Sequence, residues 1–296
     1  AIDAALTDWT FIVTKENLPD ELFLSAGDYP ALEGGGDIRF SSDPGGLNRL
    51  ACDIRTFHLD SHGGGSAAEI AVKVPSVNAA SDTTIYIWYG KAGVVQPPVT
   101  DAFGQYNAYD GSYALVSPGG GDEDRTSNQW TVTPSGGVAP GTGGQIGDKT
   151  TFSGNSSHDY YEVGDAAAWN DILSYDTSWT LECLGATNDN TAIQMIMSKA
   201  RADTVYRGPV LYYHGPDNEL SLSINENHSP VINIIKEASH TPSAGQYYHY
   251  SATYDGSNNV NGIELYIDGI QQTGTDDHTN GTITTTDHTD NLLIGA

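Results

Sequence analysis

The chain has 296 residues, in which 38 acidic side chains outnumber 12 basic ones and give a formal charge of −26 at pH 7. This length allows one large all-β domain or two domains of ordinary size. The negative charge repels nucleic-acid phosphates and anionic lipid, and no apolar run approaches the roughly 18 residues that span a bilayer, so the sequence predicts no nucleic-acid partner and no membrane insertion.

The first part of the chain alternates between short apolar runs and glycine-rich turns. The turns are GGGD at 34–37, DPGG at 43–46 and SHGGGS at 61–66. Residues 84–90, TIYIWYG, are apolar on both faces, which predicts a strand in the middle of a sandwich. The segments with the alternation typical of strands are 10–13, 37–40, 69–74 and 84–90.

A change in composition near residue 118 indicates a domain boundary. The run SPGGGDEDR at 117–125 is rich in glycine and charge, as linkers are. We therefore expect a first domain over residues 1–117, a linker over 118–126 and a second domain over 127–296.

In the second domain strand follows strand, without the alternation of strands and helices that builds a parallel sheet. A short helix is expected over 165–174, DAAAWNDILS. The predicted fold class is therefore all-β, with two β-sandwich domains of which the second is a jelly roll. The predicted strands are 148–154, 159–164, 179–186, 192–200, 210–215, 219–225, 231–237, 247–256, 263–269 and 291–296.

The stretch YYHYSATYDGSNNVNGIELYIDG at 247–269 predicts two antiparallel strands and the turn into a third. Ile263, Leu265 and Ile267 alternate towards the core. Gly256 and Gly262 are expected at positive φ in the loop, and Asp268-Gly269 as the type I′ turn of a hairpin. Glu264 and Asp268 lie about 13 Å apart by strand rise, too far for a pair of glycosidase carboxylates.

Residues 5–110 resemble the DUF2341 family, a β-rich domain of unassigned function. The segments that carry the resemblance are LTDWTFIVT at 6–14, GGGDIRFSSD at 34–43, AEIAVKVPSV at 68–77 and DTTIYIWYGKAG at 82–93. These residues are interpreted as structural, with the glycines in turns and the aromatic residues in the core.

Residues 127–296 resemble a laminin-G-like domain of the concanavalin A-like jelly-roll superfamily. The resemblance rests on 144–169, SWTLECLGA at 178–186, QYYHYSATYDG at 246–256, IELYIDGIQQTG at 263–274 and NLLIGA at 291–296. It implies binding of glycans or protein ligands, often through a calcium ion held by loops. In such domains further strands follow the one matched by NLLIGA, so we expect the C-terminal strands to be missing from this sequence.

The resemblance also suggests one ligand for a calcium ion. In calcium-binding relatives a ligand lies in the loop after the strand matched here by MIMSKA, and Asp203 occupies that position. Its alternative is a solvated loop acid. The nine histidines are scattered over loops and strands. His278 and His288 share a Thr/Asp loop without recognisable metal-ligand spacing, which is interpreted as a solvated loop, with a metal contact as the alternative. Cys52 and Cys183 are expected to be unpaired and buried.

Sugar binding needs an exposed aromatic ring beside amide or carboxylate groups. The candidates for this role are Trp130, Trp169, Tyr206, Tyr212 and Tyr213, of which we take the last four as the predicted ligand-binding residues.

Neither domain shows a catalytic pattern, since the sequence lacks both a G-x-S-x-G motif and an E-x-D-x-x-E triplet. We therefore predict a non-enzymatic recognition or adhesion module, located outside the cell on a virion or a bacterial surface. Its expected partners are a glycan or cell-surface ligand and other subunits of the same assembly. The alternatives are a polysaccharide-degrading enzyme and a purely structural virion scaffold.

Overall fold

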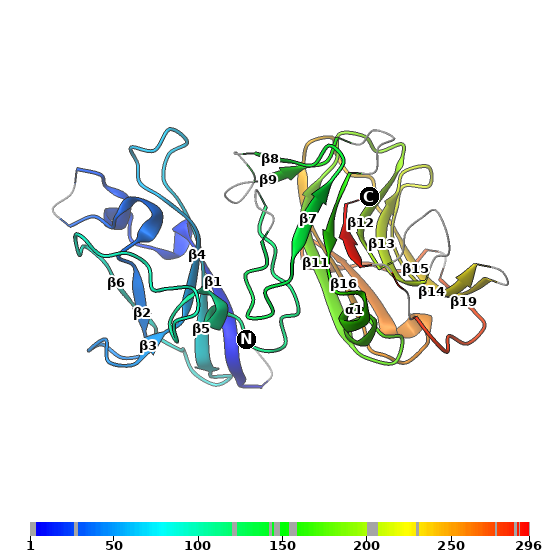
Figure 1. Cartoon of the computed structure of the whole chain (residues 1–296), viewed down its shortest axis with the longest axis horizontal. Helices are drawn as coiled ribbons and strands as arrows, with labels where there is room; N and C mark the ends of the chain where they lie inside the picture. The colour runs from blue at the N-terminus through cyan, green and yellow to red at the C-terminus, as the bar shows by residue number, and fades with distance from the viewer. Residues whose placement is uncertain are drawn as a thin grey trace. The chain divides into compact units, whose positions relative to one another are not determined.

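The structure is a computed structural model of the whole chain (Figure 1). It describes residues 4–26, 29–119, 123–141, 144, 149–153, 159–199, 207–228, 231–275, 277–286, 289 and 291–295. The chain forms two compact units, of which the first comprises residues 1–129 and 140–151 and the second residues 130–139 and 152–296.

The first unit holds two three-stranded sheets, with the strand orders β1-β5-β4 and β3-β2-β6. A separate two-stranded sheet pairs β8 with β9. The strands are β1 Leu6–Thr14, β2 Arg39–Ser41, β3 Arg49–Leu50, β4 Cys52–His58, β5 Ala67–Val77, β6 Tyr86–Trp88, β8 Ala139–Gly141 and β9 Lys149–Thr151. The short 3₁₀ helices are η1 Lys15–Asn17, η2 Asp20–Phe23, η3 Glu33–Gly35 and η4 Gln105–Ala108.

The two three-stranded sheets pack around a single core. Val13, Phe57 and Ile70 come from one sheet, and Phe40 and Leu50 from the other; all five are buried in the same cluster. The apolar face of each sheet is thereby removed from water, which is the main stabilising contribution to such a small sandwich.

Strand β6 differs from its predicted place in the middle of a sandwich. It pairs only with β2 and lies at the edge of its sheet. Trp88 is 41 % exposed, and its indole nitrogen donates to Ser41 Oγ over 2.8 Å. The second apolar face of this segment is therefore only partly covered, so the prediction of a central strand was wrong.

The predicted linker over 118–126 is also corrected in its described part. Residues 123–126 are packed into the first unit, where Asp124 and Thr126 are buried. Arg125 forms an ion pair with Asp53 over 2.7 Å, and its backbone N–H donates to Val116. The local composition of glycine and charged residues predicts a linker, because it carries no information about the contact between Arg125 and the distant Asp53.

The second unit contains an eight-stranded and a four-stranded sheet (Figure 1). Their orders are β19-β15-β14-β13-β12-β20-β10-β7 and β11-β16-β17-β18. The strands are β7 Val132–Ser135, β10 Tyr160–Val163, β11 Trp179–Ala186, β12 Ile193–Ser198, β13 Gly208–His214, β14 Glu219–His228, β15 Val231–Ser239, β16 Tyr247–Tyr254, β17 Ile263–Ile267, β18 Ile270–Gln271, β19 His278–Asn280 and β20 Leu292–Ile294. The helices are α1 Ala166–Ile172 and the 3₁₀ helix η5 Val260–Gly262.

Alternating side chains build the core between these two sheets. Leu220, Leu222 and Ile224 of β14 are fully buried, as are Ala252 of β16 and Leu265 of β17. This arrangement of two antiparallel sheets confirms the all-β prediction and the jelly roll of the second domain. Strand β20, in the segment NLLIGA, is paired on both sides, with β10 and β12.

The helix and the hairpin of the second unit form where the sequence predicts them. Asp165 caps α1 by accepting from the N–H of Ala167. Asp268 and Gly269 both have positive φ between β17 and β18, as a type I′ turn requires. Gly256 has positive φ as expected, whereas Gly262 does not; a side chain at Gly262 would collide with those of Asp255 and Ser257.

One free cysteine lies in each unit, and both are shielded. Cys52 is buried in β4, and Cys183 is half-buried in β11 opposite Tyr250. Burial raises the pKa of Cys52 to about 11 and that of Cys183 to about 12. Both thiols are therefore protonated at neutral pH, which makes them poor nucleophiles.

Both thiols are expected to react with iodoacetamide at pH 8 at least about 100-fold more slowly in the folded chain than in urea, since an unshifted thiol with a pKa near 8.5 is partly ionised. Mass spectrometry of the labelled peptides measures the two rates separately. Equal rates with and without urea at either cysteine would contradict the burial of that residue.

None of the described helices is long and apolar enough to cross a membrane.

Candidate functional site

The outer face of the four-stranded sheet carries polar and aromatic groups. In β17 the apolar residues point to the core, so Glu264 and Tyr266 point outwards. Tyr266 lies in register with Ser251 of β16 on one side and Gln271 of β18 on the other. Its hydroxyl donates to Glu264, which raises the pKa of Tyr266 and keeps the phenol neutral. This pair places a half-exposed aromatic ring beside a carboxylate.

A polar groove of about 400 Å³ opens next to this pair. We refer to it as the β17–β18 groove. It lies along the end of the sheet where the chain passes from η5 into β17 and from β18 towards β19. Its polar lining residues are Lys236, Asn261, Glu264, Gln271, Gln272, Thr273 and Asp277.

The charged groups of the groove are partly paired. Lys236 Nζ lies 2.5 Å from Asp277 Oδ2, and their side chains are 15 % and 28 % exposed. Glu264 is exposed and binds only the hydroxyl of Tyr266 among the contacts that the structure shows for its carboxylate. The groove thus offers three side-chain amides, two carboxylates and a hydroxyl, which are the groups that hydrogen-bond polyhydroxylated ligands.

Asp268, the other acid of this hairpin, has a structural role. Its carboxylate accepts from the backbone N–H of His249 over 2.8 Å, and its own N–H donates to the carbonyl of His249. The sequence interpretation of Asp268 as part of a turn agrees with this arrangement.

Two of the predicted ligand-binding residues are buried. Trp169 is 2 % exposed and packs on Trp130 with ring centroids 5.5 Å apart. Tyr213 is 3 % exposed, and its hydroxyl donates to the carbonyl of Asn190 over 3.3 Å. Neither ring presents an open face to a sugar, so the prediction of a stacking role for these two residues was wrong.

The remaining predicted site residues are Tyr212, Tyr206 and Asp203. Tyr212 of β13 is half-buried on the face of the eight-stranded sheet that points away from the core, next to His214. Burial raises its pKa. Tyr206 and the predicted calcium ligand Asp203 lie outside the described residues. A role for these three stays a prediction.

Sequence reasoning missed Tyr266 and Glu264 as binding candidates. The signal was available, because the alternation in IELYIDG already points both side chains away from the core. Much of the rest of the groove comes from residues 271–274 and Asp277, whose approach to Lys236 of β15 depends on the tertiary fold.

One family model matches most of the second unit. Residues 155–296 match the concanavalin A-like lectin/glucanases superfamily. This match confirms the laminin-G-like resemblance over most of the second unit. The DUF2341 resemblance of residues 5–110 stays a prediction. No functionally curated protein matches the sequence.

Several solved structures are similar to this chain. One is the binding domain of Paraclostridial mosquitocidal protein 1, at 16% identity and a TM-score of 0.44, covering 62% of this chain and 43% of that one. Another is the CBM40 module of Ruminococcus gnavus IT-sialidase bound to α2,3-sialyllactose, at 14% identity and a TM-score of 0.31, covering 40% of this chain and 63% of that one. A third is the carbohydrate-binding module CBM66 from Bacillus subtilis, at 12% identity and a TM-score of 0.33, covering 55% of this chain and 91% of that one. The chain thus spans less than two thirds of the length of the first two.

Proposed function

We propose that the second unit is a non-catalytic glycan-recognition module and that the β17–β18 groove, together with Tyr266, is its binding site. The observation that carries the proposal is the half-exposed Tyr266 ring bonded to Glu264, which itself lines a groove of amides and carboxylates. A ring of this kind stacks on the apolar face of a sugar, while the amides and acids orient its hydroxyl groups. The superfamily match of residues 155–296 supports this function.

The ligand that suits this groove is neutral or cationic rather than acidic. Glu264 and Asp277 contribute two carboxylates, and the only described cation in the lining, Lys236, is already paired with Asp277. An acidic sugar would meet uncompensated negative charge from Glu264, and the chain as a whole carries a formal charge of −26.

We place the module outside the cell, as part of a virion or bacterial surface assembly, on the resemblance of both domains to those found in such proteins. Fractionation of the source material tests the location. Recovery of the protein with particles or the cell envelope is the expected result, and recovery in the cytoplasm alone would contradict it.

Tyr266→Ala is expected to weaken binding of a neutral glycan by a factor of roughly 5 to 150, because an aromatic ring that stacks on a nucleic-acid base contributes roughly 1–3 kcal/mol and we expect a similar contribution for a sugar. A glycan array selects the ligand, and calorimetry with the full chain measures its Kd. Gln271→Ala, which removes an amide from the same groove, is expected to weaken binding by a smaller factor.

One variant serves as a matched control, and a second tests an alternative position of the site. Tyr29 in the first unit is 76 % exposed, so Tyr29→Ala removes an open ring and is expected to leave Kd unchanged. Tyr212→Ala tests the face of the eight-stranded sheet. Loss of binding in Tyr212→Ala with full binding in Tyr266→Ala would move the site to that face. Repeating the titration with calcium and with EGTA tests the calcium ion predicted at Asp203.

A further inference from the structure

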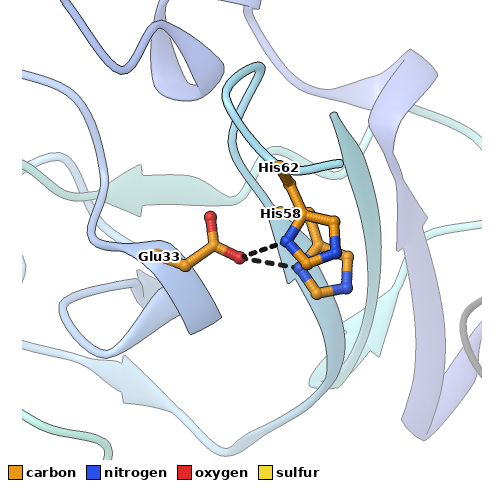
Figure 2. Close-up of side chains that lie close together, drawn as sticks. All are labelled: Glu33, His58 and His62. Atoms are coloured by element: carbon orange, nitrogen blue, oxygen red, sulfur yellow. Dashed lines mark hydrogen bonds and ion pairs between the residues drawn. The ribbon is translucent and has the colours of Figure 1, made fainter. Parts of the chain in front are cut away.

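Three side chains with metal-ligating atoms converge in the first unit (Figure 2). They are Glu33, His58 and His62, and one ligand atom from each lies within 4.8 Å of the other two. Glu33 Oε1 is 2.7 Å from His58 Nδ1 and 3.4 Å from His62 Nδ1. A single carboxylate oxygen therefore faces two imidazole nitrogens.

Backbone contacts hold each of the three residues in place. Glu33 begins η3, and its second oxygen, Oε2, accepts from the N–H of Leu59 over 2.9 Å. His58 is the last residue of β4. The N–H of His62 donates to the carbonyl of Leu59, which closes the turn and brings the second ring back over the first. Oε1 is left free to point at the two rings.

The distances fit the ligand shell of a small divalent ion. Ligands at about 2.0–2.1 Å around a tetrahedral zinc ion lie roughly 3.3 Å from one another. The separations of Glu33 Oε1 from the two Nδ1 atoms, 2.7 Å and 3.4 Å, lie on either side of that value. The two rings are stacked with centroids 3.7 Å apart and an interplanar angle of 14°, so binding requires them to tilt until both Nδ1 lone pairs meet.

The cluster is open to solvent, which gives an ion access and leaves coordination positions for water. The side chains of Glu33, His58 and His62 are 47%, 36% and 44% exposed. Gly63 and Gly64 follow His62, and Gly63 has no atom within 4 Å of where its Cβ would be, so the side of the turn beyond His62 is unobstructed.

We propose that Glu33, His58 and His62 form a binding site for a divalent transition-metal ion of the zinc class, with at least one position left for water or an added ligand. The set of two histidines and one carboxylate favours zinc over calcium, because calcium prefers six to eight oxygen ligands and imidazole nitrogen suits zinc. In the bound state the metal replaces the protons between Glu33 and the two Nδ1 atoms. This site lies in the first unit, whereas the proposed glycan site lies in the second.

Titration of the metal-free full chain with Zn²⁺, followed by calorimetry, tests the site. One ion is expected to bind with a Kd in the micromolar range or below. His62→Ala and Glu33→Gln are each expected to weaken this binding at least about tenfold, since loss of one ligand or its support has effects of that order. His62 lies in an exposed turn, so circular dichroism is expected to show an intact fold for His62→Ala.

The matched control is His214→Ala. His214 Nδ1 lies 2.9 Å from Asp217 Oδ2 in the second unit, which makes a histidine–carboxylate pair without a second histidine. This variant is expected to bind zinc as the wild type does. Cobalt(II) gives a second readout, because its visible d–d bands are expected in the wild type and absent in His62→Ala. The proposal is overturned if the wild type binds zinc no better than His62→Ala does, or if His214→Ala loses as much affinity as His62→Ala.

Discussion

Replacing Asp53 by alanine is expected to destabilise the first unit by about 3–5 kcal/mol, because it removes the acceptor from a buried network of charges. Asp53 is 2 % exposed. Its carboxylate accepts from the hydroxyl of Tyr109 over 2.7 Å and from Arg125 Nη1 over 2.7 Å. Arg55 Nε lies 3.9 Å away. Alanine would leave two guanidinium groups short of a partner in a dry environment.

The rest of the network amplifies this effect. Arg55 donates from Nε and Nη2 to the hydroxyl of Tyr109 and from Nη1 to Glu69. Burial raises the pKa of Tyr109. The charge of Arg55 lowers this pKa in part, and the carboxylate of Asp53 raises it further. The phenol therefore remains protonated and donates to Asp53. Without Asp53, the Tyr109 hydroxyl and Arg125 lose the carboxylate on β4 that accepts from both of them.

Asp53→Asn removes the negative charge of the side chain and keeps its shape, so it tests the two contributions separately. The amide keeps the volume of the side chain, but its nitrogen would face Arg125 or Tyr109 donor to donor, so we expect it to recover little of the lost stability.

Urea denaturation with thiol labelling of Cys52 measures the stability of the first unit, and labelling of Cys183 measures that of the second. Asp217→Ala removes a surface carboxylate whose side chain is 66% exposed, and it is expected to change stability by less than about 1 kcal/mol. Unchanged protection of Cys52 in Asp53→Ala would contradict the role of the network.

The same network shows what could not be predicted from the sequence. Asp53 and Arg125 are 72 positions apart, and nothing local marks them as partners. The glycines of 119–121 suggested a linker on local composition alone. Strand β4 was missed for a related reason, since its register shifts between Ile54 and Thr56 and breaks the alternation of apolar and polar residues.

The second unit was more predictable because its strands alternate regularly and its turns are chemically specified. Segment 179–186 was predicted with the bounds of β11, and Asp268-Gly269 with its turn type. The binding residues were harder to predict than the strands, because burial by the tertiary fold determines which aromatic rings remain accessible. Trp169 and Tyr213 look like sugar-stacking residues in sequence, but the fold covers both, whereas Tyr266 remains accessible.

The cluster of the first unit required the fold as well. His58 and His62 have the spacing H-x-x-x-H, which was a usable signal. Their carboxylate partner, Glu33, is 25 positions away from His58 and reaches it only through the packing of η3 against the end of β4. The sequence interpretation of metal-ligand spacing concerned His278 and His288, and the role proposed for His58 and His62 comes from the fold.

The largest effect in the second unit is expected from Tyr254→Ala, at about 3–5 kcal/mol, since it removes a buried aromatic ring and its hydrogen bonds. Tyr254 is 2 % exposed at the end of β16, and its ring lies 5.2 Å from that of Trp179. Its hydroxyl donates to the carbonyl of Tyr175 and accepts from the N–H of Asn258 over 2.8 Å. It thereby ties the turn after α1 to the loop after β16.

Tyr254→Phe isolates the hydrogen bonds from the ring. It keeps the contact with Trp179 but leaves the carbonyl of Tyr175 and the N–H of Asn258 without this partner, at an expected cost of about 1–3 kcal/mol. The matched control, Tyr247→Phe, removes a hydroxyl from a half-buried tyrosine on the outer face of the same strand and is expected to be nearly neutral. Labelling of Cys183 during urea denaturation measures all three variants, and wild-type stability in Tyr254→Phe would show that the two hydrogen bonds contribute nothing.

The same hydroxyl makes stability depend on alkaline pH. Burial raises the pKa of Tyr254, although the N–H of Asn258 partly opposes this, so the folded chain holds the phenolic proton more tightly than the unfolded chain does. The unfolded chain releases that proton near pH 10, so above this value the unfolded state binds fewer protons and the free energy of unfolding falls as pH rises. Tyr254→Phe removes this ionisation, and its destabilisation relative to the wild type is therefore expected to shrink between about pH 10 and the raised pKa.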